Sequence, residues 1–188
     1  MKNVSTTPSI KTLLSASYKP QKIAKKELEA YGWTYDPKLS RMDTKVFTDS
    51  EGKPIILHRG STRVSDWLPN NTLLATGLEK YAPRFKYGKE ITQKVKEKYG
   101  QPVTAVAHSL GGSIAEKSGA DRVITFNKPV TAYDIGKKIP KTQLDIRAQH
   151  DPVSVLSPFQ FGNKVEVPSS KQALEAHSVS SLPENLFY

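Results

Sequence analysis

The sequence predicts an α/β fold in which a mostly parallel central sheet carries helices on both faces. Strand-like apolar runs alternate with a helical pattern over residues 103–148, and such alternation is typical of parallel sheets covered by helices. The chain has 188 residues, which is enough for one domain with a single hydrophobic core. We expect this domain to span residues 21–188 and to follow a flexible segment, residues 1–20, whose first part is rich in Ser and Thr.

The first third of the chain predicts a helix and a hairpin. Residues 21–31 place apolar side chains at three- to four-residue spacing, and Gly32 can end that helix. Residues 45–48 and 54–58 read as two strands joined by the turn Asp-Ser-Glu-Gly. Short apolar runs separated by such a turn indicate an antiparallel hairpin.

The rest of the chain predicts a long helix followed by strands and shorter helices. Residues 78–99 carry an amphipathic pattern, which we expect to be broken near Pro83 and Gly88. Further strands are expected at 103–107, 122–126, 144–148 and 164–167, with helices at 110–118 and 171–176.

Composition restricts the chemistry that the chain can carry. Cysteine is absent, which excludes a disulfide framework and thiolate metal sites. The four histidines do not pair at the helical spacing of a zinc site, so we expect no metal and no other cofactor. The sequence has no signal peptide and no apolar run long enough to cross a membrane, and we expect a soluble protein.

The most informative segment is Val-Thr-Ala-Val-Ala-His-Ser-Leu-Gly-Gly, residues 103–112. An apolar strand runs directly into a helix through a turn centred on Ser109, with the small residues Ala107 and Gly111 two positions before and after it. This is the context of a nucleophile elbow, in which a strained turn exposes a reactive serine. The alternative is an ordinary strand-to-helix turn in which Ser109 only caps the helix.

A catalytic serine needs a histidine base, and elimination selects His177. His108 adjoins the serine and should point away from it, His58 precedes the loop expected to hold an oxyanion donor, and His150 is the neighbour of the best acidic candidate. His177 is therefore the expected base, although it also fits a surface residue in a C-terminal segment.

The acid of the triad should follow a strand at the carboxyl edge of the sheet. Asp151 stands just past the expected strand 144–148 and before a proline, whereas its competitor Asp145 lies inside that strand. The order Ser109, Asp151, His177 is that of α/β-hydrolases. The backbone N–H of Leu110, the residue after the nucleophile, is the expected first donor to the oxyanion.

Four segments of the chain resemble the class 3 lipases, the family of the fungal triacylglycerol lipases. In the family's order they are Ile-Ile-Leu-His-Arg-Gly-Ser with Asp-Trp shortly after, Ala-His-Ser-Leu-Gly-Gly, Val-Ile-Thr-Phe-Asn-Lys-Pro, and His-Asp-Pro-Val-Ser-Val-Leu-Ser-Pro followed by a late His-Ser. The resemblance spans roughly residues 25–180, and the chain looks similar to short microbial or virus-encoded members.

The resemblance implies roles for three further positions. It supports Asp151 as the acid, since the family has an Asp before Pro-Val. It implies that Ser61 supplies the second oxyanion donor, with Gly60 allowing a close approach. It also places Trp67 where the family has a lid tryptophan, and for this residue a lid role and a packing role stay equally open.

These observations favour a serine carboxylic ester hydrolase, lipase- or phospholipase-like, that works through an acyl-enzyme. The alternative is a non-catalytic, basic binding module on a hydrolase-like scaffold. The net charge of +10 and the pI of about 9.6 favour anionic partners; without a nucleic-acid-binding motif, we expect a lipid ester substrate at an anionic membrane rather than nucleic acid. The basic residues concentrate in residues 84–98 and in Lys22, Lys25 and Lys26.

Overall fold

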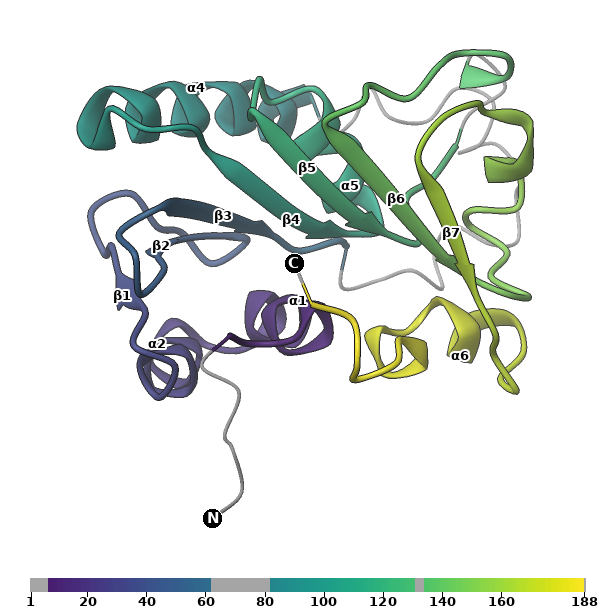
Figure 1. Ribbon diagram of the computed structural model, residues 1–188, viewed down its shortest axis with the longest axis horizontal. Coiled ribbons are helices and arrows are strands. Elements are labelled where there is room, and N and C mark those ends of the chain that lie inside the picture. The colour runs from purple at the N-terminus through teal and green to yellow at the C-terminus, as the bar shows by residue number, and fades with distance from the viewer. Residues whose placement is uncertain (1–6, 62–81, 131–133, 188) are drawn as a thin grey trace.

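The computed structural model describes residues 7–61, 82–130 and 134–187. Within these ranges a seven-stranded sheet forms the centre of the molecule, and its strands lie side by side in chain order (Figure 1). The strands are β1 (Thr34–Tyr35), β2 (Thr44–Thr48), β3 (Pro54–His58), β4 (Thr104–His108), β5 (Arg122–Phe126), β6 (Gln143–Ala148) and β7 (Lys164–Val167). Strands β1 to β3 pair antiparallel and β3 to β7 pair parallel, which confirms a mostly parallel sheet.

The helices divide between the two faces of this sheet. They are α1 (Ile10–Tyr18), α2 (Gln21–Glu29), α4 (Ala82–Tyr99), α5 (Leu110–Glu116) and α6 (Ala173–His177), with short 3-10 turns η5 (Ser157–Phe159) and η6 (Val179–Ser181). Figure 1 shows α4 and α5 on one face and α1, α2 and α6 on the other. The prediction of helices on both faces is confirmed.

The sequential strand order explains this division. Crossovers between parallel strands are almost always right-handed, so crossovers that advance in one direction place their helices on one face. Helices α4 and α5 connect β3 to β4 and β4 to β5, and both therefore cover the same face. The opposite face is covered by the two ends of the chain, which meet where the amide of Ile10 donates to Leu186 O at 2.8 Å.

Helix α1 differs from the expectation that residues 1–20 are flexible. Leu13 and Leu14 are fully buried against the sheet within the larger core cluster. The helix begins at a side-chain cap, because Ser9 Oγ accepts a hydrogen bond from the amide of Thr12 at 3.1 Å. The leucines lie on one narrow apolar face of the helix. The polar residues around them in the sequence obscure this helical pattern.

The hairpin prediction is confirmed, whereas the expected break of the long helix near Gly88 is wrong. Strands β2 and β3 pair from Thr44 with His58 to Thr48 with Pro54. Helix α4 begins at Ala82, next to Pro83, and residues 78–81 of the expected helix lie outside the described residues. Helix α4 continues through Gly88, where an added Cβ would lie 2.6 Å from Ile114 Cγ2 of α5. The glycine therefore permits close packing of two helices and does not end one. Within the described part of the chain, no helix is both long and apolar enough to cross a membrane.

Candidate active site

The candidate site lies at the carboxyl edge of the parallel strands. Ser109, Asn127 and His150 follow β4, β5 and β6, and each adopts a positive φ, of 55°, 49° and 65°. Non-glycine residues rarely take this conformation, and strained backbone tends to gather at functional sites. Three neighbouring strands thus end in sharp turns at the edge where open α/β sheets bind their ligands.

The turn at Ser109 has the form of a nucleophile elbow. Its backbone lies at φ 55° and ψ −131°, and its amide donates to Phe126 O at 3.0 Å. Two residues later, a Cβ on Gly111 would lie 2.4 Å from His58 O, so only glycine lets α5 approach β3 this closely. Ser109 occupies the N-cap position of α5 but makes no side-chain cap bond, which argues against the capping interpretation.

The structure brings the three predicted triad residues together. His177 Nε2 lies 2.9 Å from Ser109 Oγ, and His177 Nδ1 lies 2.7 Å from Asp151 Oδ1. All three side chains are buried. A serine joined to an imidazole that is itself oriented by a carboxylate is the arrangement that makes the hydroxyl nucleophilic.

Asp151 is held in its ionised form. Burial alone would raise its pKa, but its carboxylate accepts hydrogen bonds from the His177 ring, the amide and hydroxyl of Ser154, and the amide of Val153. Together these lower the pKa of Asp151 below its ordinary value. An ionised carboxylate fixes the protonated nitrogen of His177 on the Nδ1 side, which leaves Nε2 free to accept the proton of Ser109.

The other candidates for base and acid lie in different surroundings. His58 is fully buried with Nδ1 3.1 Å from Thr44 Oγ1, and His150 is exposed. Asp145 is bound by Lys128 Nζ at 2.8 Å and accepts from Thr125 Oγ1 at 2.7 Å. It is thus part of a buried ion pair with Lys128, and the carboxylate that bonds to His177 is that of Asp151.

The oxyanion donors predicted from the sequence flank Ser109. Leu110 is the first residue of α5, so its amide has no acceptor within the helix. On the other side, a Cβ on Gly60 would lie 2.7 Å from Ser109 Cβ, which places the loop carrying Ser61 directly against the nucleophile. Trp67, the predicted lid or packing residue, lies outside the described residues.

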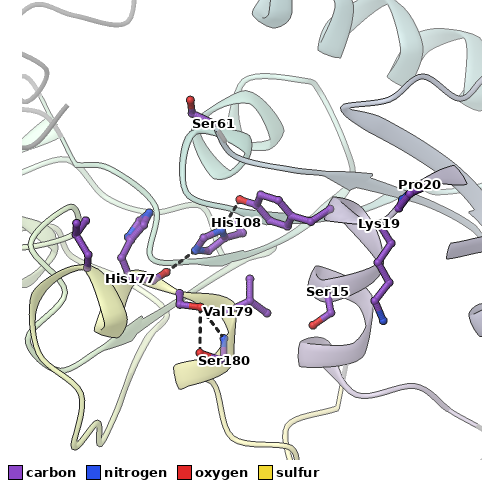
Figure 2. A pocket seen from close by; sticks show the side chains of 11 residues that line it. Ser15, Lys19, Pro20, Ser61, His108, His177, Val179 and Ser180 are labelled. Carbon is purple, nitrogen blue, oxygen red and sulfur yellow. Dashed lines mark hydrogen bonds between the residues drawn. The ribbon is translucent and has the colours of Figure 1, made fainter. Parts of the chain in front are cut away.

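A pocket of about 830 Å³ opens beside the triad, and both Ser61 and His177 line it (Figure 2). Ser15, Lys19 and Pro20 lie on one side of it, and His177, Val179 and Ser180 on the other. This volume is in the range of small-molecule sites. Among the described residues, no group of three or more histidine, aspartate and glutamate side chains is placed to hold a metal ion.

Sequence reasoning missed two residues that hold the base in place. Asn127 Nδ2 donates to Ala176 O at 2.9 Å and to His177 O at 3.2 Å, while its Oδ1 accepts from the amide of Ala148 at 2.8 Å. His108, which we expected only to point away from Ser109, also contacts the main chain of His177. The sequence singles out the segment Phe-Asn-Lys-Pro, but nothing within this segment indicates that its asparagine bonds to the main chain about fifty residues later.

Comparisons of the chain with protein-family models, with curated proteins and with solved structures found no match.

Proposed function

We propose that this chain is a serine carboxylic ester hydrolase of α/β-hydrolase fold and class 3 lipase type. The observation that carries the proposal is the continuous path of hydrogen bonds from Asp151 through His177 to Ser109, at 2.7 and 2.9 Å. The path ends at a serine that stands in a strained turn. A serine that served only structure would gain nothing from either feature.

The reaction follows from this geometry. Ser109 Oγ attacks the carbonyl carbon of the ester while His177 Nε2 takes the hydroxyl proton, and the amide of Leu110 and Ser61 stabilise the oxyanion. His177 then protonates the departing alcohol, which leaves an acyl group on Ser109. Water, deprotonated by His177, attacks this acyl-enzyme, and the acid leaves as the serine regains its proton.

We further propose a lipid ester as the substrate, bound at an anionic membrane surface. The net charge of +10 supports attraction to such a surface. The pocket beside His177, with Leu174 and Val179 in its lining, offers space for part of an acyl chain.

The alternative, a non-catalytic binding module, accounts less well for the site. Binding alone requires neither an ionised buried carboxylate behind His177 nor a positive φ at Ser109. Both features carry a free-energy cost that a chain without turnover has no reason to keep.

The test combines turnover with covalent labelling. We expect hydrolysis of p-nitrophenyl esters over a series of acyl lengths, and labelling of Ser109 by a fluorophosphonate. Ser109→Ala should abolish both, whereas Ser113→Ala, which removes a buried hydroxyl from α5, should retain them. Equal hydrolysis by wild type and Ser109→Ala would refute the proposal.

A further inference from the structure

A second path of hydrogen bonds runs beside the triad and has a defined direction. His108 Nε2 lies 2.7 Å from the backbone oxygen of His177, and a carbonyl oxygen can only accept, so Nε2 carries the proton. Burial, with His177 nearby, lowers the pKa of His108 to about 3, and the ring is therefore neutral. Its Nδ1 is then an acceptor.

Tyr18 completes the path. Its hydroxyl lies 2.6 Å from His108 Nδ1 and must donate there. The same oxygen accepts the amide of Gly60 at 2.9 Å. Burial raises the pKa of Tyr18 to about 12, so the hydroxyl keeps its proton. The path thus runs from Gly60 N–H to Tyr18, from Tyr18 to His108, and from His108 to the carbonyl of His177. Figure 2 shows the last of these bonds, between His108 and His177.

This path joins two parts of the site that both contact the nucleophile. One end is the loop of Gly60 and Ser61, and the other is the main chain of the base His177. The residues in between come from α1 and from the end of β4. A Cβ on Gly60 would lie 2.6 Å from Tyr18 Oη and 2.7 Å from Ser109 Cβ, so the loop is held tightly between tyrosine and serine.

The path also bears on which residue of the loop is the second oxyanion donor. The amide of Gly60 is donated to Tyr18, so it is not the donor that we assign to the oxyanion. The next residue, Ser61, lines the pocket together with His177, and we assign the second oxyanion donor to it.

Resting on the proposed hydrolase function, we propose that Tyr18 and His108 are positioning residues that hold the oxyanion loop and the main chain of His177 in register around Ser109. Asp151 orients the imidazole of His177 through its ring, while His108 and Asn127 fix its backbone. A displacement of about 1 Å at a reacting group can cost about a hundredfold in rate.

The first test is Tyr18→Phe, which keeps the ring and removes the hydroxyl that serves both bonds. We expect kcat to fall about 10- to 100-fold with KM nearly unchanged. Tyr87→Phe is the matched control, because the Tyr87 hydroxyl donates to Leu39 O at 3.4 Å, away from the site. An unchanged kcat in Tyr18→Phe would overturn the proposal, and so would a higher KM at wild-type kcat, which would make Tyr18 a substrate contact.

A pair of substitutions at His108 separates positioning from packing. The amide of glutamine in His108→Gln reaches the place of Nε2 and can still donate to His177 O, whereas that of asparagine in His108→Asn reaches only the place of Nδ1. We expect His108→Gln to retain more of kcat than His108→Asn. Equal losses in both variants would reduce His108 to a packing residue and overturn its part of the proposal.

A spectroscopic readout decides the inference independently of turnover. In ¹⁵N spectra of the histidine rings, we expect His108 to be the neutral Nε2–H form near neutral pH. Tyr18→Phe should shift the ring signals of His177, although Tyr18 bonds to neither of its nitrogens. If wild type neither hydrolyses esters nor reacts with the fluorophosphonate, the proposed function fails. Unchanged His177 signals in Tyr18→Phe would overturn the positioning role in either case.

Discussion

Ser61 is the residue for which a proposed role, donation to the oxyanion, can be tested by removing one hydroxyl group. It follows Gly60, whose amide is already donated to Tyr18, and it lines the pocket together with His177. Its side-chain hydroxyl and its amide are the two groups that we expect to donate to the oxyanion. Losing one such donor costs at most about a hundred- to thousandfold in kcat.

Ser61→Ala is therefore expected to lower kcat, by less than this limit because the backbone amide survives. Ser61→Thr keeps a hydroxyl and serves as the matched control, which should stay closer to wild type. Steady-state kinetics on the best p-nitrophenyl ester measure both variants. If KM rose while kcat stayed at the wild-type value, Ser61 would be a substrate contact and not an oxyanion donor.

At the scale of elements, the position of α5 against its neighbours determines where the nucleophile stands. Two glycines allow close contacts of different kinds. A Cβ on Gly111 would meet the backbone of β3 and its following loop, at 2.4 Å from His58 O and 2.8 Å from Arg59 O. A Cβ on Gly88 of α4 would meet the end of the Ile114 side chain at 2.6 Å, and a side chain can rotate away.

We expect Gly111→Ala to destabilise the fold by about 1–3 kcal/mol, as overpacking does, and to lower kcat as well because α5 carries Ser109 at its start. Gly88→Ala is the matched comparison, in which steric strain is offset by the helix preference of alanine, about 0.5–1 kcal/mol. Urea unfolding and ester hydrolysis measure the two effects. Equal loss of stability in the two variants would contradict the distinction between backbone and side-chain contacts.

At the scale of the whole molecule, two buried histidines make stability depend on acid pH. Burial lowers the pKa of His58 to about 4 and that of His108 to about 3, from an ordinary value of 6.5. Below about pH 6.5 the unfolded chain therefore binds protons that the folded chain does not. Stability is then lost as the pH falls from about 6.5 toward 4, by up to about 1.4 kcal/mol per pH unit for each histidine.

His58→Asn should flatten this dependence, because asparagine can still bond to Thr44 from the place of Nδ1 but does not titrate. His150→Gln is the control, since His150 is exposed. Urea unfolding between about pH 4 and 7 compares the slopes. A slope in His58→Asn as steep as in wild type would show that burial of His58 is not its source.

The distribution of charge over the molecule sharpens the membrane proposal. The exposed lysines of α2 (Lys22, Lys25 and Lys26) and three of the exposed lysines of α4 (Lys86, Lys89 and Lys94) belong to helices that cover opposite faces of the sheet (Figure 1). Of these two helices, α2 is the one that begins next to the pocket, because Lys19 and Pro20, which line it, directly precede this helix. A membrane that supplies substrate to this pocket would therefore face α2.

We expect faster fatty-acid release and stronger binding on vesicles that contain phosphatidylserine than on zwitterionic vesicles, with both differences reduced by salt. Changing the three α2 lysines to glutamine should weaken binding more than changing the three α4 lysines, although both variants lose the same charge. Vesicle sedimentation and fatty-acid assays measure this. Equal losses in both variants would contradict an oriented surface, and equal rates on both kinds of vesicle would contradict the anionic membrane.

The sequence by itself determined most of the strands and the order in which the candidate site residues follow one another along the chain. Strand and helix periodicity depends on which faces are buried, and so the hairpin, the strands β4 to β7 and the turn at Ser109 were readable along the chain. Because the carboxyl ends of parallel strands share one edge, chain order also indicated that Ser109, Asp151 and His177 could meet there.

Only the tertiary structure decided which distant groups touch. The close packing of α4 on α5 brings Gly88 against Ile114, and the place of α1 in the core depends on a sheet face that α4 and α5 do not cover. The bonds of Tyr18 to His108 and of Asn127 to His177 join residues far apart in the chain. Periodicity reports how each segment is buried, whereas its partners are set by crossover handedness and close packing, which no local pattern encodes.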